Sequence, residues 1–142
     1  MSYTITTRIY QTNPNAWFTT VEKTVWNYAN GGTWSEVGEK QVLTMGGSGT
    51  SGILRFNSGS EYFIVALGVD NSKRWVDVAT GLTSSQTATD AHKDYYTGGT
   101  TRAAVREKQL DKFDVKSATG RQIQVKYTVA EGNNLAADII IG

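Results

Sequence analysis

Apolar and polar side chains alternate with a period of two over much of this chain of 142 residues. The alternation runs through residues 3–10 and is clearest in residues 122–129, where Ile123, Val125 and Tyr127 are separated by polar side chains. Because successive side chains of a strand point to opposite faces of its sheet, both segments are predicted to be half-buried strands. Further strands are predicted over residues 17–22, 25–29, 41–45, 53–56, 62–69, 74–78, 113–116 and 135–141.

Two segments depart from this period and predict short helices. Residues 83–86 read Thr-Ser-Ser-Gln, which fits a capping box, so a helix is expected to begin there. Residues 101–110 are rich in good helix formers, and a linker containing two glycines separates them from the first helix. The pattern as a whole predicts a mainly β fold in a single domain, residues 1–142. We expect two antiparallel sheets packed face to face as a β-sandwich, with a short helix–loop–helix connecting them across one end.

Composition limits the classes of function. Hydrophobic residues make up 39% and charged residues 19% of the chain, which is typical of a globular domain and not of a disordered chain or a coiled coil. The formal net charge is +1 without a basic run, so nucleic acid is not expected as a partner. No window approaches the roughly 18 apolar residues of a membrane span, so no membrane insertion is expected. Met1 begins no signal-peptide pattern, and a cytoplasmic location is expected.

The chain lacks the residues of the common catalytic and metal sites. His92 is the single histidine and there is no cysteine, so a Ser–His–Asp or Cys–His site would have to use His92. This residue lies in a polar segment, residues 90–94, and is interpreted as a solvated loop residue. Zinc sites need several histidine or cysteine ligands, and the scattered carboxylates include no pair typical of a glycosidase. We therefore predict no enzyme activity, no metal and no cofactor.

Residues 47–52 spell G-x-G-x-x-G, the dinucleotide-binding fingerprint, and Asp70 lies near the offset expected for its ribose-binding acid. The fingerprint has meaning only where it follows a strand and opens a helix. Here residues 53–56 are a short apolar run without helical period, and residues 61–69 are another strand-like run. A turn between two strands is therefore the better interpretation.

Two glycine-rich segments are candidate binding loops: residues 28–34 read YANGGTW, and residues 43–52 read LTMGGSGTSG. Side chains cover little of their backbone N–H groups, and their short hydroxyls and amides suit a neutral ligand rich in hydroxyl groups, such as a sugar. Flexible hairpin turns have the same composition, although loops on a rigid sandwich often bind ligands. Residues 68–80 gather amide, carboxylate and hydroxyl groups around Trp75, either as a hydrogen-bonding rim or as a polar hairpin tip over a core tryptophan.

Five sequence words occur in order along the chain: YANGGTW at 28–34, LTMGGSGTSG at 43–52, KRW at 73–75, REKQL at 106–110 and EGNNL at 131–135. Together they resemble the fungal fruit-body lectin family. The resemblance implies a β-sandwich like that of the sea-anemone pore-forming toxins (actinoporins), a homotetramer, and a cytosolic protein without a signal peptide. It also implies a non-enzymatic lectin that binds glycans and glycoproteins of foreign cells, in defence against nematodes or insects.

The resemblance further implies two sugar sites in each subunit. The first takes galactose-β1,3-N-acetylgalactosamine, the T-antigen disaccharide, and the second takes N-acetylglucosamine. Asp70 stands where the family has a histidine, which replaces a ring able to donate and accept by an acceptor-only anion; Phe113 replaces a tyrosine and lacks its hydroxyl. The first site maps onto Ala29, Ser48, Gly49, Asp70 and Asn71, and the second onto Asp77, Val78, Thr80, Arg102 and Phe113.

The alternative function is that of a membrane-active toxin, because the implied fold is shared with pore formers. A pore former of that kind needs an N-terminal segment that can become an amphipathic helix. Residues 2–10 alternate with period two and are rich in β-branched side chains, which favours a fixed strand. Dye release from glycan-free liposomes distinguishes the two classes.

Overall fold

The computed structural model describes residues 2–26 and 31–142. These residues form ten strands in two sheets and two short helices, so the predicted mainly β fold is confirmed. The six-stranded sheet has the order β3 (Gly32–Val37), β4 (Lys40–Met45), β1 (Tyr3–Gln11), β10 (Asn134–Ile141), β9 (Gln122–Val129) and β8 (Lys112–Lys116). The four-stranded sheet has the order β2 (Thr19–Trp26), β5 (Ser51–Ser58), β6 (Glu61–Asp70) and β7 (Lys73–Leu82).

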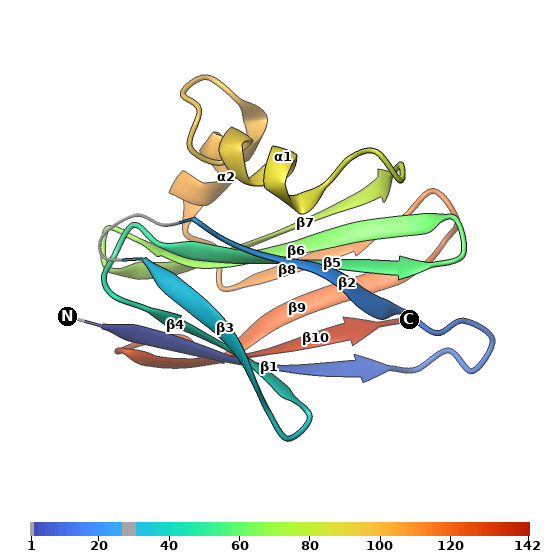
Figure 1. Cartoon of the computed structure of the whole chain (residues 1–142), viewed down its shortest axis with the longest axis horizontal. Coiled ribbons are helices and arrows are strands. Elements are labelled where there is room, and N and C mark those ends of the chain that lie inside the picture. Colours follow the sequence, from blue (N-terminus) through green and yellow to red (C-terminus); the bar gives the residue numbers. More distant parts are fainter. Residues whose placement is uncertain (1, 27–30) are drawn as a thin grey trace.

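The two sheets pack face to face, and the main hydrophobic core fills the space between them (Figure 1). In β1, the side chains of Tyr3, Ile5 and Thr7 are buried, whereas the residues between them are partly exposed. The alternation that predicted the strands therefore directs every second side chain into the core. The largest fully buried side chains of this core are Phe56, Phe63, Ile5, Leu43, Met45, Leu54, Leu67 and Ile123.

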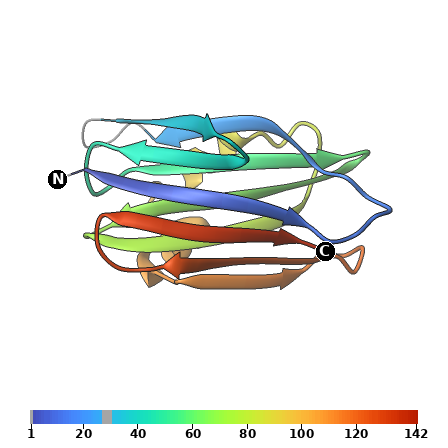
Figure 2. The same ribbon diagram turned by 90° about the horizontal axis from the view of Figure 1, so that it is seen from below.

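One pair of neighbouring strands is parallel, which corrects the prediction of two purely antiparallel sheets. β1 and β10 lie side by side and run in the same direction, with Ile5 opposite Leu135 and Ile9 opposite Ile139 (Figure 2). The other neighbours are antiparallel in both sheets. A hairpin forces its two strands to be antiparallel, but β1 and β10 come from opposite ends of the chain and no hairpin links them.

Two strands predicted near the start of the chain are a single strand. The segments predicted at 17–22 and 25–29 fall on β2, which begins at Thr19, so residues 17 and 18 precede it; residues 27–29 lie outside the described residues. A β-bulge between Thr20 and Glu22 shifts the register of β2 against β5 and so interrupts the period of two. β3 was not predicted, because it begins at a glycine pair typical of a turn and most of its side chains are exposed.

The first helix begins later than predicted. α1 (Ala88–Asp94) is capped by Thr87, whose hydroxyl accepts a hydrogen bond from the Asp90 N–H. In the predicted capping box, the Gln86 side chain does accept from the Thr83 N–H at 2.8 Å, and the Gln86 N–H donates to the Thr83 carbonyl. These bonds close a turn and not a helix, so the motif has its box-like contact without the helix that usually follows.

The second helix is close to its predicted range. α2 (Thr101–Lys108) is capped by the Thr100 hydroxyl, which accepts from the Ala103 N–H. Gln109 ends the helix in the left-handed conformation with φ of 52°, so α2 is two residues shorter than residues 101–110. No helix within residues 2–26 and 31–142 is long and apolar enough to span a membrane.

The helices lie on the outer face of the four-stranded sheet and not only across one end of the sandwich (Figure 1). They cover a second, smaller core in which Trp75 packs against Tyr95, with ring centroids 5.2 Å apart. Ile53 and Ile64 of the sheet and Ala91 of α1 complete this cluster. The outward side chains of the four-stranded sheet are therefore buried too, which explains its long apolar runs.

Candidate functional site

The loop between β4 and β5 and the turn between β6 and β7 meet at one end of the sandwich. The Gly49 N–H donates to the Val69 carbonyl at 2.8 Å, and the Ser72 N–H donates to the Ser48 hydroxyl at 2.9 Å. The structure thus brings together four residues of the first predicted site from two segments far apart in the chain. Ala29, the fifth, lies outside the described residues.

The β6–β7 turn has a fixed and unusual backbone. Asp70 pairs with Lys73, so Asn71 and Ser72 form a two-residue turn, with φ of 49° and 64°. Positive φ at both central positions is typical of the type I′ turn that suits a hairpin, but it is costly for residues other than glycine and asparagine. The hydrogen bond from Ser72 to Ser48 helps to hold this conformation, which leaves the Asn71 side chain exposed to solvent.

Asp70 is engaged within the protein. Its carboxylate accepts a hydrogen bond from Arg106 Nη1 at 2.6 Å, and its side chain is only 14% exposed. Its backbone carbonyl accepts from Gln109 Nε2, also at 2.6 Å. Asp70 therefore joins the β6–β7 turn to the end of α2, and its charge is largely neutralised before any ligand arrives.

Arg106 was not predicted as part of the site, although it lies in the REKQL word. Its Nε donates to the Tyr95 carbonyl at 2.7 Å, and its guanidinium lies 4.8 Å from the centroid of the Tyr96 ring. Nothing in the local pattern pairs Arg106 with Asp70, which is 36 residues away. Only the folded position of α2 beside the turn brings them together.

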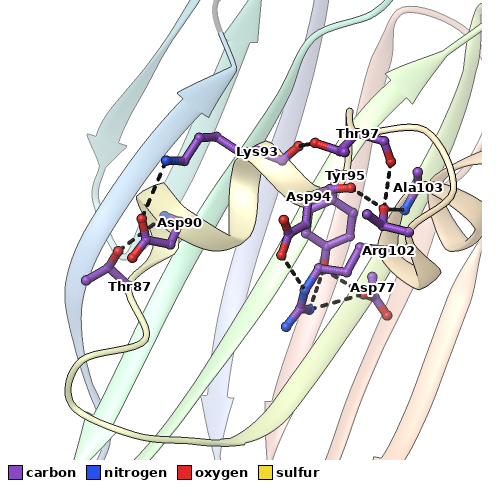
Figure 3. A network of polar contacts seen from close by, with 10 residues as sticks. Asp77, Thr87, Asp90, Lys93, Asp94, Tyr95, Thr97, Arg102 and Ala103 are labelled. Carbon is purple, nitrogen blue, oxygen red and sulfur yellow. Dashed lines mark hydrogen bonds and ion pairs between the residues drawn. The ribbon is translucent and has the colours of Figure 1, made fainter.

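The second predicted site is built around a buried carboxylate on β7 (Figure 3). Asp77 is 5% exposed, and its Oδ2 accepts a hydrogen bond from the Tyr95 hydroxyl at 2.6 Å. Arg102 of α2 points to the same place, with Nη1 at 4.0 Å from Asp77 Oδ2 and Nε at 4.0 Å from Asp94 Oδ2. Sequence reasoning placed Asp77 and Arg102 here but missed Tyr95, which links β7 to the end of α1.

Burial changes the protonation of this pair. Loss of solvent raises the pKa of the Asp77 carboxyl, and the hydrogen bonds from Tyr95 and from the Val78 backbone N–H partly oppose that effect. Burial also raises the pKa of the Tyr95 phenol, and the neighbouring Asp77 raises it further. Tyr95 is therefore a protonated donor to Asp77 at neutral pH, and the two groups act as one hydrogen-bonded unit.

The other residues of the second predicted site lie on two neighbouring strands. Val78 is 5% exposed and packs in the main core, so its side chain is little available to a ligand. Thr80 is half-buried near the end of β7. Phe113 is half-buried on β8, which is an edge strand of the six-stranded sheet and contacts β7, the edge strand of the other sheet. Four of the five residues therefore come from β7 and α2, and Phe113 comes from the strand beside them.

Comparison with known proteins identifies the family. Residues 1–139 match the model of the fungal fruit body lectin family. The chain belongs to this family. It is 55% identical to a lectin of Boletus edulis, over 99% of each chain. Two crystal structures of a lectin from Xerocomus chrysenteron, one wild-type and one with three methionine substitutions, each superpose with a TM-score of 0.96 and 56% identity. They cover all of this chain, and the chain covers 99–100% of them. This fungal fruit body lectin is therefore a carbohydrate-binding protein with the sandwich fold of its relatives.

His92 of the lectin is a buried helix residue, so its interpretation as a solvated loop residue was wrong. It is 3% exposed, with Nδ1 at 2.8 Å from the Thr24 hydroxyl and Nε2 at 2.8 Å from the Ser51 hydroxyl. The Ser51 hydroxyl lies 2.7 Å from the Tyr96 hydroxyl. Burial lowers the pKa of His92 to about 4. These hydrogen bonds join α1, through the imidazole, to β2 and β5 of the sheet beneath it.

The arrangement of His92 differs from that of a catalytic triad. A nucleophilic serine needs access to substrate and a histidine oriented by an acid. Ser51 is fully buried, and the second imidazole nitrogen faces the hydroxyl of Thr24. The G-x-G-x-x-G word also has no helix after it, because residues 46–50 join β4 to β5, as predicted. The described part of the lectin holds no group of three histidine, cysteine, aspartate or glutamate side chains placed to bind a metal.

Proposed function

We propose that the lectin binds the T-antigen disaccharide, galactose-β1,3-N-acetylgalactosamine, at the first site. The observation that supports this best is the junction of the β4–β5 loop with the β6–β7 turn, where Gly49 is hydrogen-bonded to Val69 and Ser48 to Ser72, on either side of Asp70 and Asn71. An exposed asparagine amide both donates and accepts, and the backbone around Gly49 has little side-chain cover. Such mixed and neutral groups match the hydroxyls and the acetamido group of the disaccharide.

The pairing of Asp70 with Arg106 supports a neutral ligand at this site. The family histidine would offer a donor and an acceptor, whereas Asp70 offers only acceptors, one of which Arg106 already uses. Asp70 therefore acts on the sugar through the position of the turn and not as a free anion. In this proposal, Ser48, Gly49, Asn71 and the segment that contains Ala29 bind the disaccharide.

We propose that the second site binds terminal N-acetylglucosamine. Asp77 and Arg102 offer an acceptor and a donor at the edge of the sandwich, and Thr80 adds a half-buried hydroxyl nearby. The Val78 side chain lies in the core, so its part in binding would come from its backbone. Phe113 supplies an apolar wall but no phenolic hydrogen bond, so we expect the affinity for this sugar to be weakened and not abolished.

We further propose that the lectin acts as a homotetramer in the cytoplasm, without enzyme activity, in defence against nematodes or insects. Weak sugar sites gain avidity when several are linked, often by about 10²–10⁴. Membrane insertion is disfavoured by the position of β1, which pairs with β4 on one side and β10 on the other. Releasing β1 as a helix would break both pairings in the middle of the sheet.

The galactosyl site predicts the effect of Asn71→Ala. Loss of this side chain should weaken binding of the T-antigen disaccharide by on the order of 1–3 kcal/mol, because a sugar hydroxyl would lose its partner. Ser48→Ala should also weaken it, through loss of the hydroxyl that holds the turn. Calorimetry with the disaccharide measures both effects. Asn15→Ala, at an exposed asparagine on the β1–β2 connection at the other end of the sandwich, is the control. Unchanged affinity for the disaccharide in a variant that carries both Asn71→Ala and Ser48→Ala would refute the assignment of the first site.

The second site predicts opposite effects of two substitutions. Asp77→Asn, which keeps the shape but removes the charge beside Arg102, should greatly weaken N-acetylglucosamine binding. Phe113→Tyr should strengthen it by about 0.5–1.5 kcal/mol, the usual worth of one net hydrogen bond. Calorimetry with terminal N-acetylglucosamine glycans measures both, and thermal unfolding controls for loss of the Tyr95–Asp77 contact. The site is wrong if Asp77→Asn folds and binds like the parent.

The tetramer predicts a solution mass of about four times the 15.5 kDa of one chain in light scattering. The chain has no cysteine, so an assembly must rest on surface buried between copies. A monomer at micromolar concentration would contradict both the assembly and its avidity.

A further inference from the structure

A polar cleft beside the first site is lined by a half-buried arginine, Arg74. Residues of the β6–β7 and β9–β10 turns line the cleft. Both turns lie at the end of the sandwich where the glycine-rich β4–β5 loop also lies (Figure 1). It has a volume of about 230 Å³. Buried Tyr3 and Leu135 line its inner part together with Arg74, whereas Lys73 and Glu131 are exposed on its rim. The cleft thus has two cations and one anion, and the cation that lies deepest is Arg74.

Arg74 lacks the hydrogen bonds that a buried guanidinium normally has. Its side chain is 18% exposed, and its contact with Asp111 is long, at 3.9 Å. Nε of Arg74 is buried without a partner, and none of the described residues accepts a hydrogen bond from the guanidinium. A guanidinium carries five N–H donors, and burying a charge without acceptors is costly.

Three other arginines that are buried or half-buried show what is missing. Arg55 also has a buried Nε without a partner, but its Nη2 donates to the Ser84 carbonyl at 2.9 Å. Arg106 has hydrogen bonds to Asp70 and to the Tyr95 carbonyl, at 2.6 and 2.7 Å. Arg121 donates to the two carboxylate oxygens of Glu61, at 2.9 and 3.1 Å. Arg74 is about as buried as Arg106 and Arg121 but lines an open cleft, and its long contact with Asp111 leaves its guanidinium without a hydrogen bond to the described residues. Its environment is that of a site whose acceptor comes from outside the chain.

The chemistry of the cleft identifies the acceptor as an anion. The planar fork of a guanidinium binds carboxylates and sulfates through two parallel hydrogen bonds, and an adjacent lysine adds a second positive charge. Glu131 is exposed on the opposite rim, where it can accept from a hydroxyl group of the same ligand.

We propose that this cleft binds an acidic substituent, a carboxylate or a sulfate, of a glycan whose galactosyl residue occupies the first site. The proposal rests on the proposed galactosyl site. Asn71 lies in the two-residue β6–β7 turn, and Arg74 lies on β7 two residues after that turn, whose backbone the Ser48 hydroxyl holds. The turn thus presents neutral groups to the galactosyl residue in the first site, and Arg74 just after it presents a positive charge to the acidic substituent beside that residue. The lectin would therefore prefer acidic forms of its disaccharide to the neutral form.

The test compares three ligands by calorimetry: the neutral T-antigen disaccharide, its sialylated form and its sulfated form. The parent should bind an acidic form about tenfold more tightly, the usual gain for hydrogen bonds between charged groups. Arg74→Gln should lose this preference and keep its affinity for the neutral disaccharide. Lys73→Gln should lose part of it. Lys116→Gln, which removes an exposed charge on β8, should keep all of it. The preferred acidic form shows whether the natural group is a carboxylate or a sulfate.

Equal binding of the neutral and acidic forms by the parent would overturn the proposal, as would a preference that persists in Arg74→Gln. If Arg74→Gln does not fold, the Lys73→Gln variant is the test instead. If Lys73→Gln prefers the acidic disaccharide over the neutral form as strongly as Lys116→Gln does, the result counts against the cleft. If the parent does not bind the neutral disaccharide, the galactosyl site is wrong. The cleft is then tested alone, with sulfate and free sialic acid. Either anion should raise the melting temperature of the parent and not that of the Lys73 or Arg74 variant, and no rise in the parent refutes the cleft.

Discussion

Gly68→Ala is expected to destabilise the lectin by about 3 kcal/mol or more, near the upper end for an overpacked core. Gly68 lies on β6 between Ser51 of β5 and Trp75 of β7. A Cβ atom at this position would lie 2.5 Å from the Ser51 Cβ, 2.7 Å from the Thr50 carbonyl oxygen and 2.8 Å from Trp75 Nε1. Thr50, Ser51 and Trp75 are all fully buried, so none of them has free space to move into.

Urea unfolding of both proteins measures this effect. Gly98→Ala is the matched control, because a Cβ at Gly98 meets nothing within 4 Å and its φ is not positive. It should change the free energy of unfolding by less than about 0.5 kcal/mol. A value for Gly68→Ala within 1 kcal/mol of the parent would show that the sheet can open at this point. Such a shift would also move the start of β5, and with it Gly49 and Ser48 of the first site.

Periodicity predicted most strands of the lectin because both sheets bury one face in the main core. It failed where another constraint decided the backbone. β3 begins at a glycine pair, and a bulge in β2 interrupts the period. The order of the strands is a property of long-range pairing, and the parallel pairing of β1 with β10 has no local signal. The helix start moved to Thr87 because the Thr83–Gln86 motif closes a turn instead.

The candidate site was predictable in its loops and not in its ion pairs. Glycine density and the family resemblance drew attention to Ser48, Gly49 and Asn71, which the structure brings to one junction; their part in sugar binding stays a prediction. Asp70 looked like a free acceptor in the sequence, and only the position of α2 shows that Arg106 uses its charge. His92 likewise lies among polar neighbours in the sequence, but α1 turns it inward onto β2 and β5. Contacts between side chains far apart in the chain leave no trace in a local pattern.

Burial of His92 predicts that the lectin loses about 3 kcal/mol of stability between pH 7 and pH 4. The pKa of His92 is lowered from 6.5 to about 4 by burial. Above pH 6.5 the imidazole is neutral in both states and stability is unaffected. As the pH falls from 6.5 towards 4, the unfolded chain binds a proton that the folded protein does not. The contribution of His92 to the free energy of unfolding therefore falls as the pH drops from 6.5 to about 4, and it changes little at lower pH.

The variant His92→Gln isolates this effect from the titration of carboxyl groups such as Asp77, whose pKa burial moves upwards. Glutamine can still exchange hydrogen bonds with Thr24 and Ser51 but cannot take up a proton in this range. Urea unfolding at pH 7 and pH 4 should therefore show a larger loss in the parent, by about 3 kcal/mol. If the variant does not fold, the chemical shift of the His92 ring in the parent, followed by NMR, gives the pKa directly. A ring that titrates near 6.5, or equal losses in both proteins, would mean that solvent reaches the imidazole. The Ser51–His92–Thr24 contacts would then not be the rigid join between α1 and the sheet that the structure shows.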